Sequence, residues 1–146
     1  MSEHLEQYKA YLQDLGNLGS RHETARGFFL SVLSALIAFL ALAGNQGPLG
    51  KIGGPLYTLV AIAGIAVCAF WIAYTLSLSA IYRVKFRLLG EIEKNCKLPC
   101  KLFSVEFPLL TDDPRYSRLT YIECGLAVVL AVLFFGSIVI KWKTGL

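Results

Sequence analysis

Three long stretches without a charged residue constrain this sequence more than any other feature. They cover residues 27–50, 52–82 and 124–140. A helix needs roughly 17 to 25 apolar residues to cross the hydrocarbon of a bilayer, and each stretch meets that length. Hydrophobic residues make up 55% of the chain and charged residues 16%, compared with roughly 45 to 50% and about 25% in soluble domains. The sequence therefore predicts an integral membrane protein.

The predicted fold is all-α, with three transmembrane helices in a single membrane domain over residues 1–146. The spans are placed at 27–44, 56–79 and 124–140. A cytoplasmic N-terminal amphipathic helix over 1–20 and a cytoplasmic loop over 80–123 complete the predicted organisation.

The middle stretch is longer than a bilayer requires. Pro55 suits the first turn of a helix, where its missing N–H costs nothing. Further along, Arg87 and Glu91 stand four residues apart, a spacing that supports a helix through an ion pair on one face. We therefore predict that the second span continues into the cytoplasm toward Lys94.

The third span is predicted to begin before the membrane. Asp113 followed by Pro114 combines a good helix cap with a good first-turn residue. A helix that starts at this pair would lead directly into the apolar stretch.

The N-terminal segment is predicted to be helical. Apolar residues recur every three or four positions between Leu5 and Leu15, the period of an amphipathic helix. Helices that lie on lipid favour Lys and Arg on their polar face, whereas the charges here are mostly acidic. We therefore expect this helix to pack against the protein's own cytoplasmic helices.

A break is predicted between this helix and the first span. Gly16 and Gly19 are poor helix formers. Ser20 and Glu23 follow at the spacing of a capping box. The first membrane helix is therefore expected to begin at Arg21.

The basic residues indicate an orientation. The N-terminal segment and the 80–123 loop together hold eleven Lys and Arg, against three elsewhere. By the positive-inside rule, the N-terminus and this loop are cytoplasmic and the C-terminus lies outside. A cleaved secretory signal is disfavoured, because four acidic residues precede the first apolar stretch.

The sequence offers little chemistry. Cys96 and Cys100 supply only two of the four convergent ligands that a structural zinc site needs. A disulfide between them is not expected, because thiols in a cytoplasmic loop stay reduced. No ionisable residue lies in the three apolar stretches, which argues against ion-coupled transport and catalysis within the membrane. The loop also lacks a histidine that could serve as a general base. We therefore expect no catalytic residue, no metal, no cofactor and no enzymatic activity.

Small and polar residues inside the spans are candidates for helix packing or for lining a pore. Such residues let membrane helices approach closely and hydrogen-bond to one another. The candidates are Ser31, Ser34, Gly64, Thr75 and Ser137.

Basic residues beside the first two spans are expected to gather at the inner membrane face. They either fix the topology and touch anionic headgroups, or bind a phosphorylated ligand or a cytoplasmic partner. No phosphate-binding glycine loop accompanies them, and no specific nucleic acid is expected. The candidate binding residues are Arg21, Arg26, Arg83, Lys85, Arg87 and Glu91.

Several short motifs follow one another along the chain. They are LGNLGSR at 15–21, GFFLS at 27–31, Trp71, YRVKF at 82–86, EIEK at 91–94 and LP at 98–99. Over roughly residues 8–110 the chain resembles a group of small bacterial integral membrane proteins, and is similar, more distantly, to the SLATT-type membrane effectors of anti-phage systems. This resemblance implies an oligomer that perturbs the bacterial inner membrane when a partner senses infection.

The expected function is accordingly a non-enzymatic membrane effector that self-associates, with the lipid bilayer and a separate cytoplasmic sensor or signalling protein as partners. The alternative is an adaptor or regulatory subunit that anchors a cytoplasmic partner without forming a pore. A channel or carrier for small molecules ranks lower, because the spans contain no charge.

Overall fold

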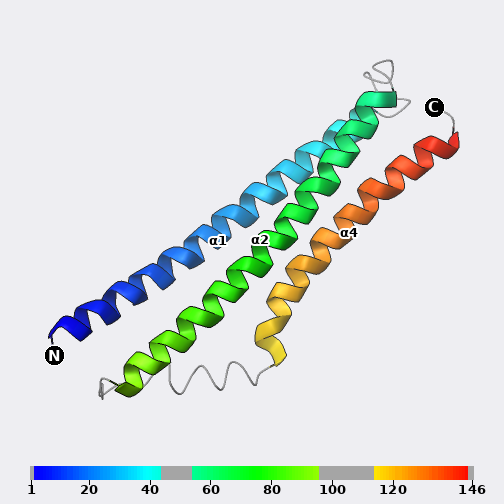
Figure 1. Ribbon diagram of the computed structural model, residues 1–146. Coiled ribbons are helices and arrows are strands. Elements are labelled where there is room, and N and C mark those ends of the chain that lie inside the picture. Colours follow the sequence, from blue (N-terminus) through cyan, green and yellow to red (C-terminus); the bar gives the residue numbers. More distant parts are fainter. Residues whose placement is uncertain (1, 44–53, 96–113, 145–146) are drawn as a thin grey trace. The chain divides into compact units, whose positions relative to one another are not determined.

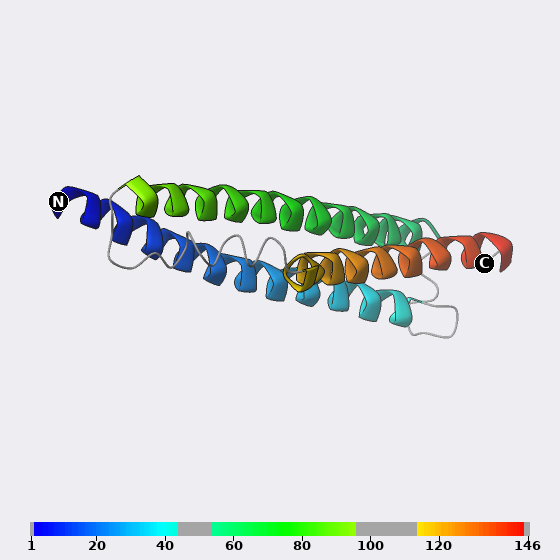
Figure 2. The ribbon, with the colours of Figure 1, turned by 90° about the horizontal axis from the view of Figure 1, so that it is seen from below.

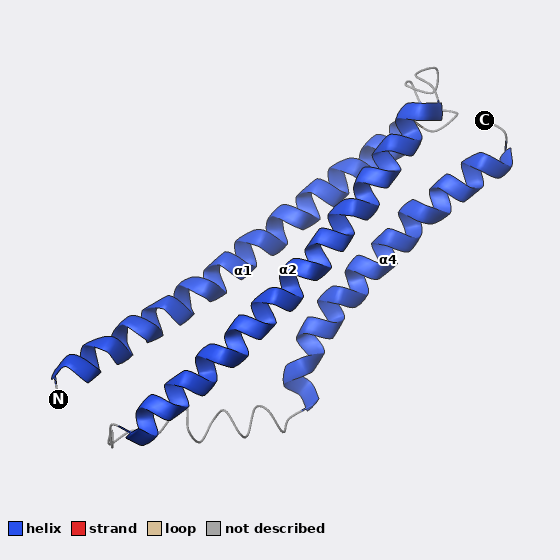
Figure 3. Cartoon of the chain, in the orientation of Figure 1, coloured by secondary structure: helices blue, strands red, loops and turns tan. Residues whose placement is uncertain are grey.

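The structure is a computed structural model, which describes residues 2–43, 54–95 and 114–144 (Figure 1). Apart from Ala43, all of these residues are helical (Figure 3). The helices are α1 (Ser2–Leu42), α2 (Gly54–Asn95) and α4 (Pro114–Thr144). The all-α prediction is therefore confirmed.

Each of these helices contains a segment long and apolar enough to cross a membrane. The segments are Glu6–Leu42, Pro55–Lys94 and Thr120–Lys143. Only 11%, 22% and 17% of their most apolar windows are buried within the chain. Lipid or further protein must cover the rest, because so much apolar surface is not stable in water.

Helix α2 continues as a helix past the second apolar stretch to Asn95, as predicted. It has 42 residues, which corresponds to about 63 Å at the usual rise of an α-helix. The hydrocarbon of a bilayer is only about 30 Å thick, so α2 is longer than one crossing requires; the cytoplasmic location of its C-terminal part stays a prediction. Helix α4 begins at Pro114 as predicted, whereas Asp113 lies outside the described residues.

The predicted break in the N-terminal region is wrong. Helix α1 continues without interruption from Ser2 to Leu42, so the separate helix over 1–20 and a new start at Arg21 are not seen. A glycine costs a helix only about 1 kcal/mol relative to alanine, and packing against α2 offsets that. At Gly19, a β-carbon would lie 3.3 Å from the Tyr82 hydroxyl, so the absence of a side chain allows this close approach.

The chain divides into two compact units. The first, called here the charged unit, comprises residues 1–24 and 75–122; the second, the apolar unit, comprises 25–74 and 123–146. Helices α1, α2 and α4 each contribute residues to both units.

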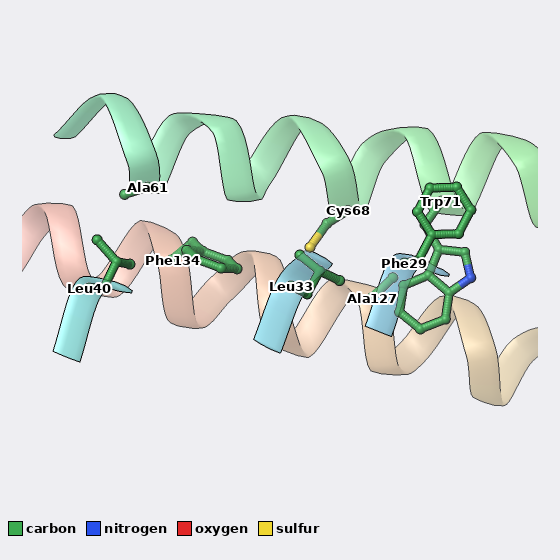
Figure 4. Close-up of a cluster of buried hydrophobic side chains, with 8 residues drawn as sticks. All are labelled: Phe29, Leu33, Leu40, Ala61, Cys68, Trp71, Ala127 and Phe134. Carbon is green, nitrogen blue, oxygen red and sulfur yellow. The ribbon is translucent and has the colours of Figure 1, made fainter. Parts of the chain in front are cut away.

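The core of the apolar unit draws on α1, α2 and α4. Its buried residues are Phe29, Leu33, Leu40, Ala61, Cys68, Trp71, Ala127 and Phe134 (Figure 4). The rings of Phe29 and Trp71 stack, with centroids 5.8 Å apart and an interplanar angle of 14°. Gly64 is buried against Phe134, and a β-carbon there would lie 2.6 Å from the phenyl ring. This glycine lets α2 and α4 approach closely.

In the charged unit, the N-terminal part of α1 runs beside the C-terminal part of α2 in both ribbon views (Figures 1 and 2). Tyr8, Leu12 and Leu15 are half-buried, and Leu89 of α2 is fully buried. The N-terminal residues therefore pack against the protein's own helix, as their periodicity predicted.

Candidate functional site

A buried carboxylate marks the end of α2 in the charged unit. The Tyr8 hydroxyl donates a 2.9 Å hydrogen bond to Oε1 of Glu93, and Glu93 is fully buried. A carboxylate taken out of water is stable only when it is hydrogen-bonded or paired. The Tyr8–Glu93 contact therefore anchors the N-terminus of α1 to the last turn of α2.

Lys85, one of the predicted binding residues, makes an internal contact. Its ammonium group donates to Oδ2 of Asp14 and forms an ion pair with it. The Lys85 side chain is largely covered, whereas Asp14 is mostly exposed. Lys85 is therefore already engaged in joining α1 to α2.

The other candidate residues of the charged unit remain at its surface. Arg83 folds back along its own helix, where Nε donates to the Ser79 carbonyl over 3.4 Å. Arg21, Arg87 and Glu91 are exposed. These groups are accessible to an anionic headgroup, a ligand or another protein.

Arg26 belongs to the apolar unit instead. Its guanidinium lies 3.7 Å from Oε1 of Glu123, a buried carboxylate, while about half of the Arg26 side chain stays exposed. The candidate basic residues are thus divided between the two units, and two of them, Lys85 and Arg26, have acidic partners.

Two of the four candidate hydroxyl groups in the spans bond to their own helices. Ser31 donates to the carbonyl of Gly27 over 2.8 Å, and Ser137 donates to the carbonyl of Phe134 over 2.7 Å. Ser34 is exposed on α1. Serine commonly satisfies its hydroxyl in this way within helices, so these bonds leave the helix surface small and weakly polar.

Thr75 differs from these serines. It is 3% exposed, and its hydroxyl oxygen has no hydrogen-bond partner among the described residues. A buried hydroxyl without a partner costs about 1 to 3 kcal/mol. Thr75 is therefore a weak point of the packing at the edge of the charged unit.

The acidic partners Glu93 and Glu123 were not among the predicted site residues. Glu93 accepts a hydrogen bond from a tyrosine hydroxyl, and Glu123 pairs with an arginine on another helix. The sequence held one signal for Glu93, which stands four residues after Leu89 and so shares a helix face with an apolar residue; in the structure Leu89 is fully buried. An acid on the buried face of a helix requires a polar partner.

Within 2–43, 54–95 and 114–144, no group of three or more His, Cys, Asp or Glu could hold a metal ion. Cys96, Cys100 and the connection over 44–53 lie outside the described residues.

Comparison with known proteins adds one finding. The model of the octameric membrane protein family (8xMP) matches residues 5–142. Curated proteins and solved structures give no match. The family match covers α1 from Leu5 onward, all of α2 and nearly all of α4.

Proposed function

The chain belongs to the octameric membrane protein family, an assignment that makes it an oligomeric membrane protein, and from this premise we propose that it is a non-enzymatic membrane effector. Copies assemble into a ring, of eight if this chain follows the family's name, and perturb the bacterial inner membrane. The proposed setting is anti-phage defence, in line with the resemblance to SLATT-type effectors. A separate cytoplasmic protein supplies the signal.

The observation that carries this proposal is a stripe of small residues on the exposed side of α1 in the apolar unit. Gly27, Ser31, Ser34 and Ala38 are all exposed and recur at four, three and four residues. Small residues in a span favour close contact with another helix, and hydroxyl groups also suit the wall of a pore.

The exposed surface of α4 is different. It presents large apolar side chains such as Val129, Val132 and Ile140. Lipid tails suit this surface. The contrast favours an assembly in which α1 faces other copies or a central path while α4 meets lipid.

The proposed orientation places the N-terminus and the charged unit in the cytoplasm, where they can meet the signalling partner. This follows from the eleven basic residues outside the spans on that side. The exposed Arg21 and Arg87 would then contact anionic headgroups or the partner.

The proposal is tested on membranes and in cells. Protein in liposomes is assayed for dye release, and bacteria that express it are followed with a potential-sensitive dye during phage infection. We expect depolarisation with the natural chain and its loss in the Ser31→Leu/Ser34→Leu variant. A matched control, Val128→Leu/Val132→Leu, alters the large apolar surface of α4 and should retain activity. Membranes that stay tight around an assembled protein would contradict the effector function.

The alternative function, an adaptor without a pore, is favoured by the contacts of the charged unit. Tyr8–Glu93 and Asp14–Lys85 hold the projecting ends of α1 and α2 together, and a rigid hairpin of this kind can serve as a platform for a cytoplasmic protein. An adaptor would leave liposomes tight and co-purify with its partner from the native cell.

A further inference from the structure

The charged unit exposes an apolar stripe on α2. Ile81, Val84 and Leu88 are 43%, 58% and 39% exposed, and Glu91 continues the stripe by one further turn. Six of the twelve residues over 83–94 are charged, which places this part of α2 in water rather than among lipid tails. Lipid therefore does not cover the stripe.

Helix α1 exposes a complementary stripe in the same unit. Lys9, Gln13, Gly16 and Ser20 recur at four, three and four residues and are all exposed. Gly16 and Ser20 have little or no side chain, and nothing lies within 4 Å of the position that a Gly16 β-carbon would take. This surface is open and shallow, so it can receive larger side chains.

Contacts within the charged unit set the two stripes at matching heights. Tyr8 meets Glu93, Asp14 meets Lys85, and Gly19 lies against Tyr82. These contacts define an antiparallel register, which makes four pairs level along the helix axes. The level pairs are Lys9 with Glu91, Gln13 with Leu88, Gly16 with Val84, and Ser20 with Ile81.

The two stripes do not meet within one chain, because both are exposed. Counting about 100° of turn per residue from the positions that face the partner helix, they point to opposite sides of the α1–α2 pair. A ring of copies needs two different surfaces that fit each other. Copies that cross the same bilayer sit at the same depth, so level residues of neighbouring copies meet.

We infer that the Ile81–Glu91 stripe of α2 packs against the Lys9–Ser20 stripe of α1 in a second copy of this chain, with Lys9 and Glu91 forming an ion pair across the interface. Large apolar side chains meet small ones, and opposite charges meet at the same level. Complementary charges of this kind fix the register and the choice of partner. The inference rests on the proposed assembly of copies.

Crosslinking tests the predicted pairing. In a parent that lacks its four cysteines, one tagged copy carries Gln13→Cys and a second, differently tagged copy carries Leu88→Cys. After oxidation with copper phenanthroline, we expect a disulfide between the two tags. In the mismatched pair, Gln13→Cys with Ile81→Cys, the sulfurs are displaced by about 10 Å along the helix. We expect about tenfold less crosslinked product from the mismatched pair, because disulfides need close approach.

Charge reversal tests the ion pair without new cysteines. Lys9→Glu and Glu91→Lys should each raise the dissociation constant of the assembly in detergent about three- to tenfold per interface, as expected for surface charge pairs. The double variant should return it to the natural value. Lys143→Glu, a reversal at an exposed position of the apolar unit, should have no effect.

The outcomes separate this interface from the assembly itself. A parent that is monomeric in detergent overturns the proposed assembly and the interface with it. An assembled parent whose matched and mismatched pairs crosslink equally, or whose double reversal dissociates as readily as the single variants, overturns the interface alone. The stripe on α2 would then face another protein.

Discussion

The apolar unit and the charged unit use the same helices but hold them together differently. In the apolar unit, stacked rings and a buried glycine fill the contact between helices. In the charged unit, a tyrosine–carboxylate hydrogen bond and an ion pair join α1 to α2. The difference follows from the surroundings. In lipid the hydrophobic effect does not drive helices together, so their association depends on close packing of side chains. In water, polar pairs can fix the register of two amphipathic helices.

Truncating the stacked tryptophan should have the largest effect. Trp71 is 2% exposed, and Trp71→Ala should lower the free energy of unfolding by about 3 to 5 kcal/mol, as for large aromatic residues in other cores. Thermal unfolding in detergent measures this. Trp142 is 89% exposed, so Trp142→Ala should change stability little. Equal losses from both variants would mean that the stack does not hold the apolar unit.

The glycine contact should give the next largest effect. Gly64→Ala places a methyl group against the buried Phe134 ring, and overpacking of this kind costs about 1 to 3 kcal/mol. Gly125 has nothing within 4 Å of its β-carbon position, so Gly125→Ala should stabilise the helix slightly, since alanine is the better helix former. Phe134→Leu should partly rescue Gly64→Ala; a tolerated Gly64→Ala would show that α2 and α4 do not pack this closely.

In the charged unit, replacing Tyr8 with phenylalanine removes only the hydroxyl that binds Glu93. Tyr8→Phe should destabilise the contact of α1 with α2 by about 1 to 2 kcal/mol, because the buried Glu93 side chain loses this donor. Hydrogen exchange over 2–24 and 75–95 should increase while the apolar unit keeps its protection. Tyr11 is exposed, so Tyr11→Phe is a matched control without this effect. Unchanged exchange in Tyr8→Phe would show that the Tyr8–Glu93 hydrogen bond does not hold α1 against α2.

Thr75 should respond in the opposite direction. Its buried hydroxyl has no partner among the described residues, so Thr75→Val should raise stability by about 1 kcal/mol, since the cost of burying that hydroxyl disappears. Thr75→Ser keeps the hydroxyl and should not stabilise the protein. A loss of stability in Thr75→Val, measured by thermal unfolding, would show that the hydroxyl binds a group outside the described residues.

The smallest effect is expected at the exposed ion pair. Lys85→Ala or Asp14→Ala should cost about 0.2 to 1 kcal/mol, because water screens a pair of which Asp14 is mostly exposed. The cost should fall further as salt is added. Unfolding at low and high salt measures it, with Lys143→Ala as control. A loss of stability that does not depend on salt would show that the Lys85–Asp14 pair is shielded from water, contrary to the exposure of Asp14.

Much of the fold could be predicted from local patterns. The start of α4 follows from Pro114, a residue that suits the first turn of a helix. The extension of α2 past Arg83 follows from the four-residue spacing of Arg87 and Glu91. The continuity of α1 through Gly16 and Gly19 could not, because the small intrinsic penalty of glycine is outweighed by contacts with residues some sixty positions away, such as Tyr82.

For the candidate site, the sequence predicted which basic residues take part but not which residues they contact. The sequence identified Arg26 and Lys85 as basic residues near the membrane, but their acidic partners Glu123 and Asp14 are set by which helix faces which. Glu93 was not among the predicted site residues, although it is fully buried and bound to Tyr8.

The sequence by itself determined that this chain crosses the membrane with three helices, because a long stretch without charge prefers hydrocarbon to water whatever surrounds it. The family match shows that the protein is oligomeric. Only the tertiary structure decided the antiparallel register of α1 and α2, the engagement of Lys85 and the burial of Glu93. These depend on contacts between residues distant in sequence, and the period of a helix specifies which face is apolar but not the height at which two such faces meet.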